Sequence, residues 1–277
     1  MQFMHTEIYV IYLTWPADHE WTHRGLLDKK NYWGWNMDEI DFKGKIVLVV
    51  GAHPDDNDFG AGATVAKAAI EGAEVIYLIA TTGQRGSSAE TMTPERLSDI
   101  RKKEQEDAAR VLGVREVHFL NYVDGELIPD IRLKEQVVIH IRRFRPDMVF
   151  TMDPSFYYFK DFGFVNHSDH RAIGEATLDA CYPLARDLLS FPEHPKAGLS
   201  PHKVKEILLH SFVPENANFF VDVTDTYDIK IRALSLHQSQ VSDMPKLEKR
   251  IRDRAEAAGR LAGCRFAEAF VRLHLPE

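Results

Sequence analysis

From Lys45 onward, continuous apolar runs alternate with segments whose apolar residues have helical spacing. Residues 45–52 (KIVLVVGA) and 74–81 (EVIYLIAT) are apolar runs bounded by polar segments, which is typical of strands buried on both faces of a parallel sheet. Between them, residues 63–72 have the pattern of a helix that ends at Gly72. This order of strand, helix and strand is the repeating unit of α/β proteins.

The alternation continues along the chain. Thr93, Pro94 and Gly113 are suited to be the N-cap, the first residue and the end of a longer helix. Because right-handed crossovers place helices on both faces of a parallel sheet, we predict an α/β fold, a three-layer α/β/α Rossmann-like sandwich with a mostly parallel sheet. Further strands are predicted over residues 117–122, 147–152, 205–212, 218–224 and 267–274, and helices over 93–113, 133–146, 167–185, 229–241 and 246–263.

The first 44 residues differ from the rest. They hold all four tryptophans and show neither strand nor helix periodicity, so we interpret residues 1–44 as an N-terminal extension of a domain over 45–277. The apolar run from Ile8 to Trp15 is far shorter than the roughly 20 residues of a membrane span, and no cationic segment accompanies it. We therefore expect a cytoplasmic protein with no membrane partner.

Charge and cysteine content narrow the function. The 277 residues carry a formal net charge of −8 with the two signs interspersed, and no Lys/Arg run exceeds two residues, so no nucleic-acid partner is expected. A neutral or modestly polar small molecule fits better. The two cysteines, Cys181 and Cys264, are interpreted as reduced core thiols.

The segment His53-Pro54-Asp55-Asp56 directly follows the first predicted strand, where ligands bind in open α/β sheets. His53 and Asp56, three residues apart on a turn, can face one point, and imidazole with carboxylate suits Zn²⁺ as two of the three protein ligands of an open site. Asp55 is then left free for proton transfer. The alternative is an Asp-rich turn that caps the following helix.

A second cluster, Asn166-His167-Ser168-Asp169-His170, follows the strand predicted at 147–152 and so belongs to the same sheet edge. His167 and His170 lie three apart at a helix start, so one can bind metal while the other reaches substrate, and Asp169 can orient an imidazole. The alternative for this pair is a capped, solvent-facing helix start. Two such clusters at one edge favour a metal site.

These motifs together resemble the PIG-L/LmbE-like N-deacetylases, which hydrolyse acetamido groups on N-acetylglucosamine-type sugars. The resemblance covers about residues 45–241 and is nearest to the diacetylchitobiose deacetylase-type branch. Its motifs are GAHPDDNDFGAG (51–62), TTGQRGSS (81–88), IRKKEQEDAARVLGV (100–114), NHSDHRAIG (166–174) and HQSQV (237–241).

The resemblance implies Zn²⁺ as cofactor, a small N-acetylated amino sugar as substrate, and a homo-oligomer, either a trimer or a hexamer. It also implies a mechanism in which an aspartate activates water and a protonated histidine, held by a second aspartate, stabilises the tetrahedral intermediate. The residues in these roles are the metal ligands His53, Asp56 and His170, the general base Asp55, the electrophilic His167 and its orienting partner Asp169.

Substrate contacts are less sharply defined. Where the family commonly has Gly-Glu, this chain has Gly83-Gln84, and we expect Gln84 to act as a neutral hydrogen-bonding group. Arg85 and Arg101 are candidates for holding sugar hydroxyls, with surface ion pairs as the alternative. The resemblance places His237 near the pocket, while its helical register with Ile231 and Leu234 favours a buried structural histidine.

Asp58, Gly60 and Gly62, which follow the first cluster, also need an interpretation. We interpret Asp58 as a helix cap, with support of the metal ligands as the alternative. Gly60 and Gly62 do not complete GxGxxG, and the second strand ends without an acidic residue, so we expect no phosphate loop. Small residues here would instead allow helix and strand to approach closely.

The sequence therefore predicts a metal-dependent hydrolase with Asp55 as general base. A non-catalytic sugar or nucleotide binding module on the same sheet is one alternative, but such a module would not need a free aspartate beside metal ligands. A metal hydrolase of another bond, such as a phosphoester or a ring amide, is the other. Two-metal phosphatases usually supply more ligands than these two clusters contain.

Overall fold

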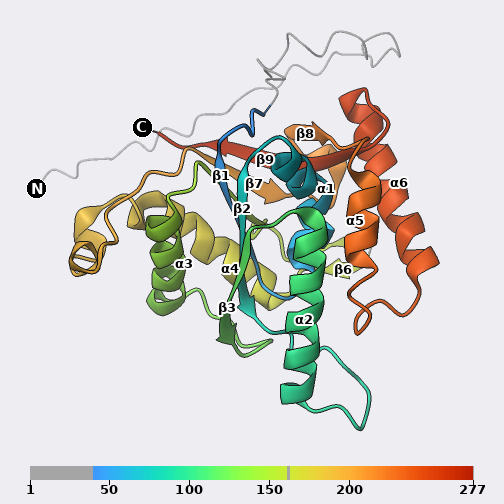
Figure 1. Cartoon of the computed structure of the whole chain (residues 1–277), viewed down its shortest axis with the longest axis horizontal. Helices are drawn as coiled ribbons and strands as arrows, with labels where there is room; N and C mark the ends of the chain where they lie inside the picture. Colours follow the sequence, from blue (N-terminus) through green and yellow to red (C-terminus); the bar gives the residue numbers. More distant parts are fainter. Residues whose placement is uncertain (1–39, 161–162, 277) are drawn as a thin grey trace, which may run out of the picture. The chain divides into compact units, whose positions relative to one another are not determined.

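The computed structural model describes residues 40–160 and 163–276 (Figure 1). The four tryptophans of the N-terminal extension lie outside the described residues. The prediction of an extension over residues 1–44 stays a prediction. The first strand starts at Ile46, and Phe42, which precedes it, is already buried in the core of the domain.

A seven-stranded sheet forms the centre of the domain. Its first five strands in spatial order are parallel, whereas β9 runs antiparallel to both of its neighbours, β7 and β8. The predicted mostly parallel sheet is confirmed. In spatial order the strands are β3 (Glu116–Tyr122), β2 (Glu74–Thr81), β1 (Ile46–Gly51), β4 (Met148–Met152), β7 (Glu206–His210), β9 (Ala267–His274) and β8 (Phe219–Asp222), with β5 (Tyr158–Phe159) and β6 (Phe164–Val165) paired as a separate hairpin.

Helices cover both faces of the sheet, as expected for a three-layer sandwich (Figure 1). One face packs against α1 (Asp56–Ile70), α2 (Pro94–Leu112), α5 (Tyr227–Leu234) and α6 (Met244–Ala262). The other face packs against α3 (Ile131–Phe144) and α4 (Ser168–Asp179). Each helix contributes its apolar side to one of two hydrophobic cores.

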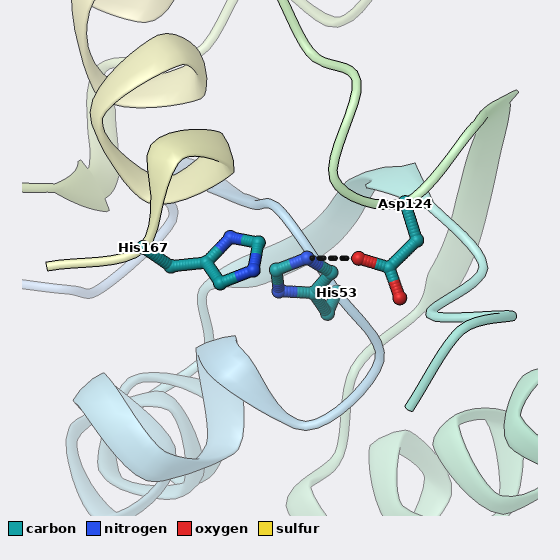
Figure 2. Close-up of side chains that lie close together, drawn as sticks. All are labelled: His53, Asp124 and His167. Atoms are coloured by element: carbon teal, nitrogen blue, oxygen red, sulfur yellow. Dashed lines mark ion pairs between the residues drawn. The ribbon is translucent and has the colours of Figure 1, made fainter. Parts of the chain in front are cut away.

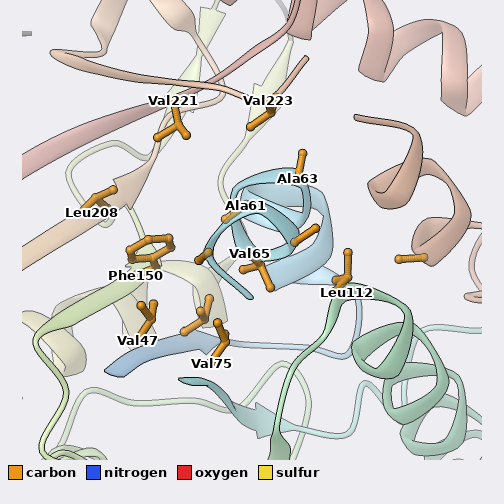
Figure 3. Packing of buried hydrophobic residues seen from close by; sticks show 14 of the residues in the cluster. Val47, Ala61, Ala63, Val65, Val75, Leu112, Phe150, Leu208, Val221 and Val223 are labelled. Carbon is orange, nitrogen blue, oxygen red and sulfur yellow. The ribbon is translucent and has the colours of Figure 1, made fainter. Parts of the chain in front are cut away.

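Successive residues of the central strand β1 serve different cores. Val47 and Val49 belong to the core beneath α1, part of which is drawn in Figure 3, whereas Leu48 and Val50 belong to the core beneath α3 and α4. Side chains alternate between the faces of a strand, so a strand covered on both faces must be apolar at every position. This explains the continuous apolar runs in the sequence.

The ends of α2 agree with the predictions, whereas α1 begins seven residues before the predicted start at Ala63 and two later helices end differently. Thr93 Oγ1 accepts a hydrogen bond from Arg96 N (3.2 Å), and α2 ends before Gly113, which has a left-handed φ of 80°. The helix predicted over 167–185 changes to a π-helical turn after Asp179, where Pro183 supplies no backbone N–H. The helix predicted over 229–241 already ends at Leu234, and Ser235 Oγ donates to a backbone carbonyl of its last turn.

The two cysteines are free thiols, as expected. Cys181 is buried in the core, and its burial raises the pKa of its thiol far above the usual value. Cys264 is only partly buried, because it lies in the bend between α6 and β9. The prediction of a core position is therefore correct for Cys181 and wrong for Cys264.

Candidate metal and catalytic site

The turn between β1 and α1 carries the first cluster, and the start of α4 carries the second. Because β1 and β4 are parallel neighbours, their carboxyl ends lie at one sheet edge. The structure brings three residues together there. Asp56 Oδ2 lies 3.2 Å from His53 Nδ1, and Asp56 Oδ1 lies 3.1 Å from His170 Nε2.

This trio, His53, Asp56 and His170, has the donor set of a metal site. One ligand atom from each residue lies within 4.8 Å of the other two. Two ligands on a tetrahedral zinc ion, each at about 2.1 Å, are about 3.4 Å apart, so the spacing fits such an ion. Burial alone would raise the pKa of Asp56, but His170 and His53 outweigh it and hold the pKa well below its usual value. Asp56 is therefore ionised at neutral pH, as a carboxylate ligand of a metal ion must be.

The second nitrogen of His53 faces two further carboxylates. His53 Nε2 lies 3.1 Å from Asp124 Oδ1, as Figure 2 shows, and 3.2 Å from Asp169 Oδ2. The Asp169 carboxylate is buried and also accepts hydrogen bonds from the backbone N–H groups of Gly125 (2.7 Å) and Leu127 (3.2 Å). In the neutral imidazole, the ring nitrogen between two carboxylates carries the proton, so Nδ1 is the nitrogen that a metal ion would take.

Burial would lower the pKa of His53, but Asp56, Asp124 and Asp169 outweigh this effect and raise it well above the usual value. Three carboxylates around one imidazole leave an excess of negative charge in a buried site. A divalent cation beside Asp56 would neutralise this charge. The chemistry of the residues therefore fits a bound metal ion.

His167 has a different environment from the one expected. Its ring lies edge-on to His53, with centroids 4.8 Å apart (Figure 2), and its Nδ1 accepts a hydrogen bond from the backbone N–H of Asp169 (3.2 Å). Burial and the neighbouring His53 lower the pKa of His167. The carboxylate of Asp169 faces His53 instead, because Gly125 N and Leu127 N hold it there. The prediction that Asp169 orients a protonated His167 is therefore corrected.

Ligand atoms of His53, Asp124 and His167 also lie within 4.8 Å of one another. This second trio shares His53 with the first. Its His53 nitrogen is Nε2, which already lies between two carboxylates at hydrogen-bond distance. The geometry therefore favours the first trio for a metal ion and leaves the second as the group that fixes the tautomer of His53.

Asp55 occupies a strained position at the start of α1. Its φ is 104°, a value that residues other than glycine rarely adopt. Its backbone N–H donates to Gln105 Oε1 (2.7 Å), and Arg101 Nη2 lies 3.3 Å from its carboxylate and 2.6 Å from Pro54 O. Burial and the neighbouring charge of Asp56 raise the pKa of Asp55 to about 6. Such a group is suited to accept a proton near neutral pH.

Asp58 does not cap α1, contrary to the preferred interpretation. Its buried carboxylate accepts hydrogen bonds from Tyr77 Oη (2.9 Å) and Gln105 Nε2 (3.0 Å) and lies 2.7 Å from His237 Nε2. Gln105 in turn holds the backbone of Asp55. Asp58 therefore supports the candidate base through one intermediate side chain.

His237 is only 1% exposed and is paired with Asp58, so a direct contact with substrate does not agree with its position. Its position agrees with the alternative interpretation, a buried structural histidine. Burial alone would lower the pKa of His237, but the hydrogen bond and the charge of Asp58 outweigh it and raise the pKa. α5 ends before this residue, and the following turn aims its ring inward.

Arg101 is buried and pairs with Asp55, so the alternative of a surface ion pair is wrong, and a contact with sugar hydroxyls stays a prediction. It donates to Gly83 O (3.0 Å) as well as to Pro54 O, and thereby ties two loops of the site together. Gly83 has a φ of 60°, and a Cβ there would collide with the Arg101 guanidinium. Both constraints explain the glycine at this position.

Arg85 is about half exposed and forms an ion pair with Glu126, which matches the alternative interpretation. Gln84 Oε1 accepts a hydrogen bond from Thr82 Oγ1 (2.9 Å), and its Nε2 donates to Tyr122 O (3.4 Å). A substrate contact by Gln84 stays a prediction. Gly60 lies against His210 at the end of β7, so a small residue is indeed required for close packing there.

Sequence reasoning missed Asp124. It follows β3 and thus lies at the same sheet edge as the two recognised clusters. Its position after a strand, in the segment NYVDG, was the one local signal. No second polar residue accompanied it at a metal-ligand spacing, and the pairing with His53 arises only from the arrangement of the strands.

A groove of about 920 Å³ opens from this cluster. Asp55, Asp56 and His170 line its inner end. Its other end is formed by α6 and by aromatic residues of the β5–β6 hairpin and of the segment after β7. The groove is large enough to contain a substrate of disaccharide size.

Known proteins resemble this chain over most of its length. The family described as PIG-L: GlcNAc-PI de-N-acetylase matches residues 48–181. Diacetylchitobiose deacetylase of Thermococcus kodakarensis is 31% identical, over 84% of this chain and 87% of the relative. A probable N-acetyl-alpha-D-glucosaminyl L-malate deacetylase 2 of Bacillus cereus is 28% identical, over 72% and 84%.

A solved structure shares the fold. N,N'-diacetylchitobiose deacetylase from Pyrococcus horikoshii, in complex with an inhibitor, superposes with a TM-score of 0.79 at 30% identity, covering 88% of this chain and 90% of that one. Among the helices of the described residues, none combines the length and the apolar character that crossing a membrane requires.

Proposed function

Because the chain belongs to the PIG-L family of de-N-acetylases, we propose that it hydrolyses the acetamido group of an N-acetylglucosamine-type sugar at a zinc site formed by His53, Asp56 and His170. The observation that carries the proposal is an unligated aspartate, Asp55, with a pKa of about 6 directly beside these residues. A bound zinc ion supplies a Lewis acid that polarises the acetamide oxygen and lowers the pKa of water.

Asp55 acts as the general base. At neutral pH its carboxylate is ionised and takes a proton from the attacking water as the water oxygen adds to the carbonyl carbon. The C–N bond then breaks, and the same carboxyl returns the proton to the leaving nitrogen. The products are acetate and the free amino sugar.

His167 stabilises the negative charge on the former carbonyl oxygen. Since its Nδ1 accepts the backbone N–H of Asp169, its proton resides on Nε2, and a neutral imidazole donates that proton as a hydrogen bond. Loss of one such donor costs about 3 kcal/mol of transition-state stabilisation. Charge on His167 is not needed for this role.

Arg101 and Gln105 position the base. Both contact Asp55 from α2, and together they maintain its unusual backbone conformation. Asp124 and Asp169 perform the equivalent task for His53, because they fix which of its nitrogens faces the metal. The site is thus rigid before substrate binds.

Release of acetate and of free amine tests the proposal. The zinc-loaded enzyme should liberate the two in equal amounts from N-acetylglucosamine derivatives, and a chelator should abolish the reaction until zinc is restored. Sugar binding without acetate release would instead support a non-catalytic binding module. Phosphate release from phosphorylated sugars, without acetate, would support a phosphoester hydrolase.

We also propose that the enzyme is a homo-oligomer, a trimer or a hexamer. Apolar side chains are exposed in the segment after α4, where Tyr182 is 49%, Leu188 52% and Leu189 83% exposed. An interface between subunits would cover such residues. Size-exclusion chromatography with light scattering measures the assembly. A cytoplasmic location stays a prediction from the sequence.

A further inference from the structure

The outer half of the groove has a chemical character of its own. The three basic residues Lys246, Arg250 and Arg254 of α6 all line it, and their spacing of four residues places them on one face of the helix. This face looks into the same groove that has Asp55, Asp56 and His170 at its inner end. Positive charge and the candidate catalytic centre therefore share one binding space.

Only one of these basic residues is fully occupied by the protein. Arg254 donates to Phe59 O (2.9 Å), and its guanidinium lies over the Phe212 ring, 5.2 Å from the centroid. Neither Lys246 nor Arg250 has a carboxylate within 4.0 Å among residues 40–160 and 163–276. Both are exposed to the groove and free to meet a ligand.

The rest of α6 differs from this face. Lys249 pairs with Asp253 (2.7 Å) and Arg252 pairs with Glu248 (2.9 Å), and these four residues do not line the groove. Lys249 and Arg252, outside the groove, are thus neutralised on their own helix, whereas Lys246 and Arg250 inside it are not. One acidic residue, Asp243, lines the outer half, and its Oδ1 accepts the backbone N–H of Lys246 (2.9 Å). An excess of positive charge remains.

Apolar side chains also line the groove. Phe59, Phe212, Leu247 and Ile251 all line it, and Phe164 from the hairpin lies 6.4 Å from Phe212 by ring centroids. Aromatic rings pack well against the C–H faces of sugars. A ligand that reaches from the inner end to Lys246 and Arg250 would cross this apolar surface.

From this arrangement we propose that the preferred substrate is an N-acetylated amino sugar that carries an anionic group, a carboxylate or a phosphate, remote from its acetamido group. Lys246 and Arg250 bind that group while the acetamide reaches the centre formed by His53, Asp56 and His170. This inference rests on the proposed deacetylase function and adds the charge of the substrate to it. Lys246 and Arg250 are then specificity-determining residues rather than catalytic ones.

Matched substrates test the inference. The zinc-loaded enzyme is assayed with N-acetylglucosamine 1-phosphate, with an N-acetylglucosaminyl conjugate of a dicarboxylic acid, and with neutral N,N'-diacetylchitobiose. The anionic substrates should have the higher kcat/KM. Their KM should rise with ionic strength, whereas the KM of the neutral disaccharide should not. The better of the two anionic substrates identifies which group the subsite accepts. A higher kcat/KM for the neutral disaccharide would overturn the inference.

Variants locate the effect. The double variant K246Q/R250Q should lose about tenfold or more in kcat/KM with the anionic substrate, mainly through KM, because charge-assisted hydrogen bonds are lost. Its zinc content and thermal unfolding should match the wild type, which shows that it folds, and its loss in kcat/KM with the neutral disaccharide should be much smaller than its loss with the anionic substrate. The control Lys249→Gln removes the same kind of charge from the same helix outside the groove and should change neither substrate. Equal losses with both substrates would contradict the subsite.

Calorimetry separates this inference from the proposed function. Binding of N-acetylglucosamine 1-phosphate and of N-acetylglucosamine to the zinc-loaded protein does not depend on turnover. Tighter binding of the phosphate, lost in K246Q/R250Q but not in Lys249→Gln, would support the subsite even if no acetate were released. Equal binding of the two sugars would refute the subsite even if deacetylation were observed.

Discussion

His53 Nε2 lies 3.2 Å from Asp169 Oδ2, although 116 positions separate the two residues in the sequence. The carboxylate is buried and held by two backbone N–H groups, so its position does not depend on solvent or on a flexible side chain. Carboxylates on the outer nitrogen of a metal-binding histidine fix its tautomer and raise its basicity. In the proposed zinc site, Asp169 would therefore act on the metal through His53.

Replacement of Asp169 tests this relationship. Asp169→Asn keeps the size of the side chain but removes its charge, so zinc affinity should fall by about 10- to 100-fold, as for other partners of this kind. Competition with a chromogenic chelator measures it. Asp124→Asn is the comparison, because Asp124 faces the same nitrogen. Unchanged zinc affinity in both variants would show that neither carboxylate supports His53.

Asp55 should be needed for turnover and not for metal. Asparagine tolerates positive φ better than most residues, so Asp55→Asn can keep the backbone conformation. Loss of the general base should reduce the rate of acetate release by about 100-fold or more while zinc content stays at the wild-type level. Elemental analysis and the acetate assay give the two values. A loss of zinc parallel to the loss of rate would make Asp55 a ligand instead.

Replacement of His170 and replacement of His167 should have different effects on zinc binding and on rate. His170→Ala removes one of the three proposed ligands, so zinc should dissociate at chelator concentrations that the wild type resists. His167→Ala should retain zinc and lose about 100-fold or more in kcat, because one donor to the developing oxyanion is gone. If His167→Ala lost zinc and His170→Ala kept it, the metal would belong to the second trio.

The His237–Asp58 pair should make stability depend on pH. The folded state raises the pKa of His237, so it binds this proton more tightly than the unfolded chain does. The resulting stabilisation is complete below the unfolded pKa of about 6.5 and is lost as the pH rises through the higher folded pKa. The difference in Tm between wild type and His237→Gln should therefore shrink from about pH 5.5 toward pH 9. A constant difference over this range would contradict the shift. Thermal unfolding of metal-free protein measures it.

Local patterns in the sequence determined the layers and the position of the main site. The long apolar runs within β1 and β2 required a sheet covered on both faces, and the ends of α2 were specified by Thr93, Pro94 and Gly113. Residues directly after the parallel strands had to meet at one edge of the sheet, where the carboxyl ends of these strands lie. For these reasons the two segments that carry His53, Asp56 and His170 could be grouped from the sequence alone.

Which side chain faces which depended on tertiary structure. Asp58 was expected to cap a helix, but it is buried and bonded to Gln105, which holds Asp55. Arg101 is buried and pairs with Asp55, and Asp124, which was not predicted, faces His53. These contacts join segments that are many residues apart, and the period of a helix or strand gives only the face on which a residue lies. The partner on that face is decided by sheet order and by the packing of α2 and α5 against α1, which local patterns do not encode.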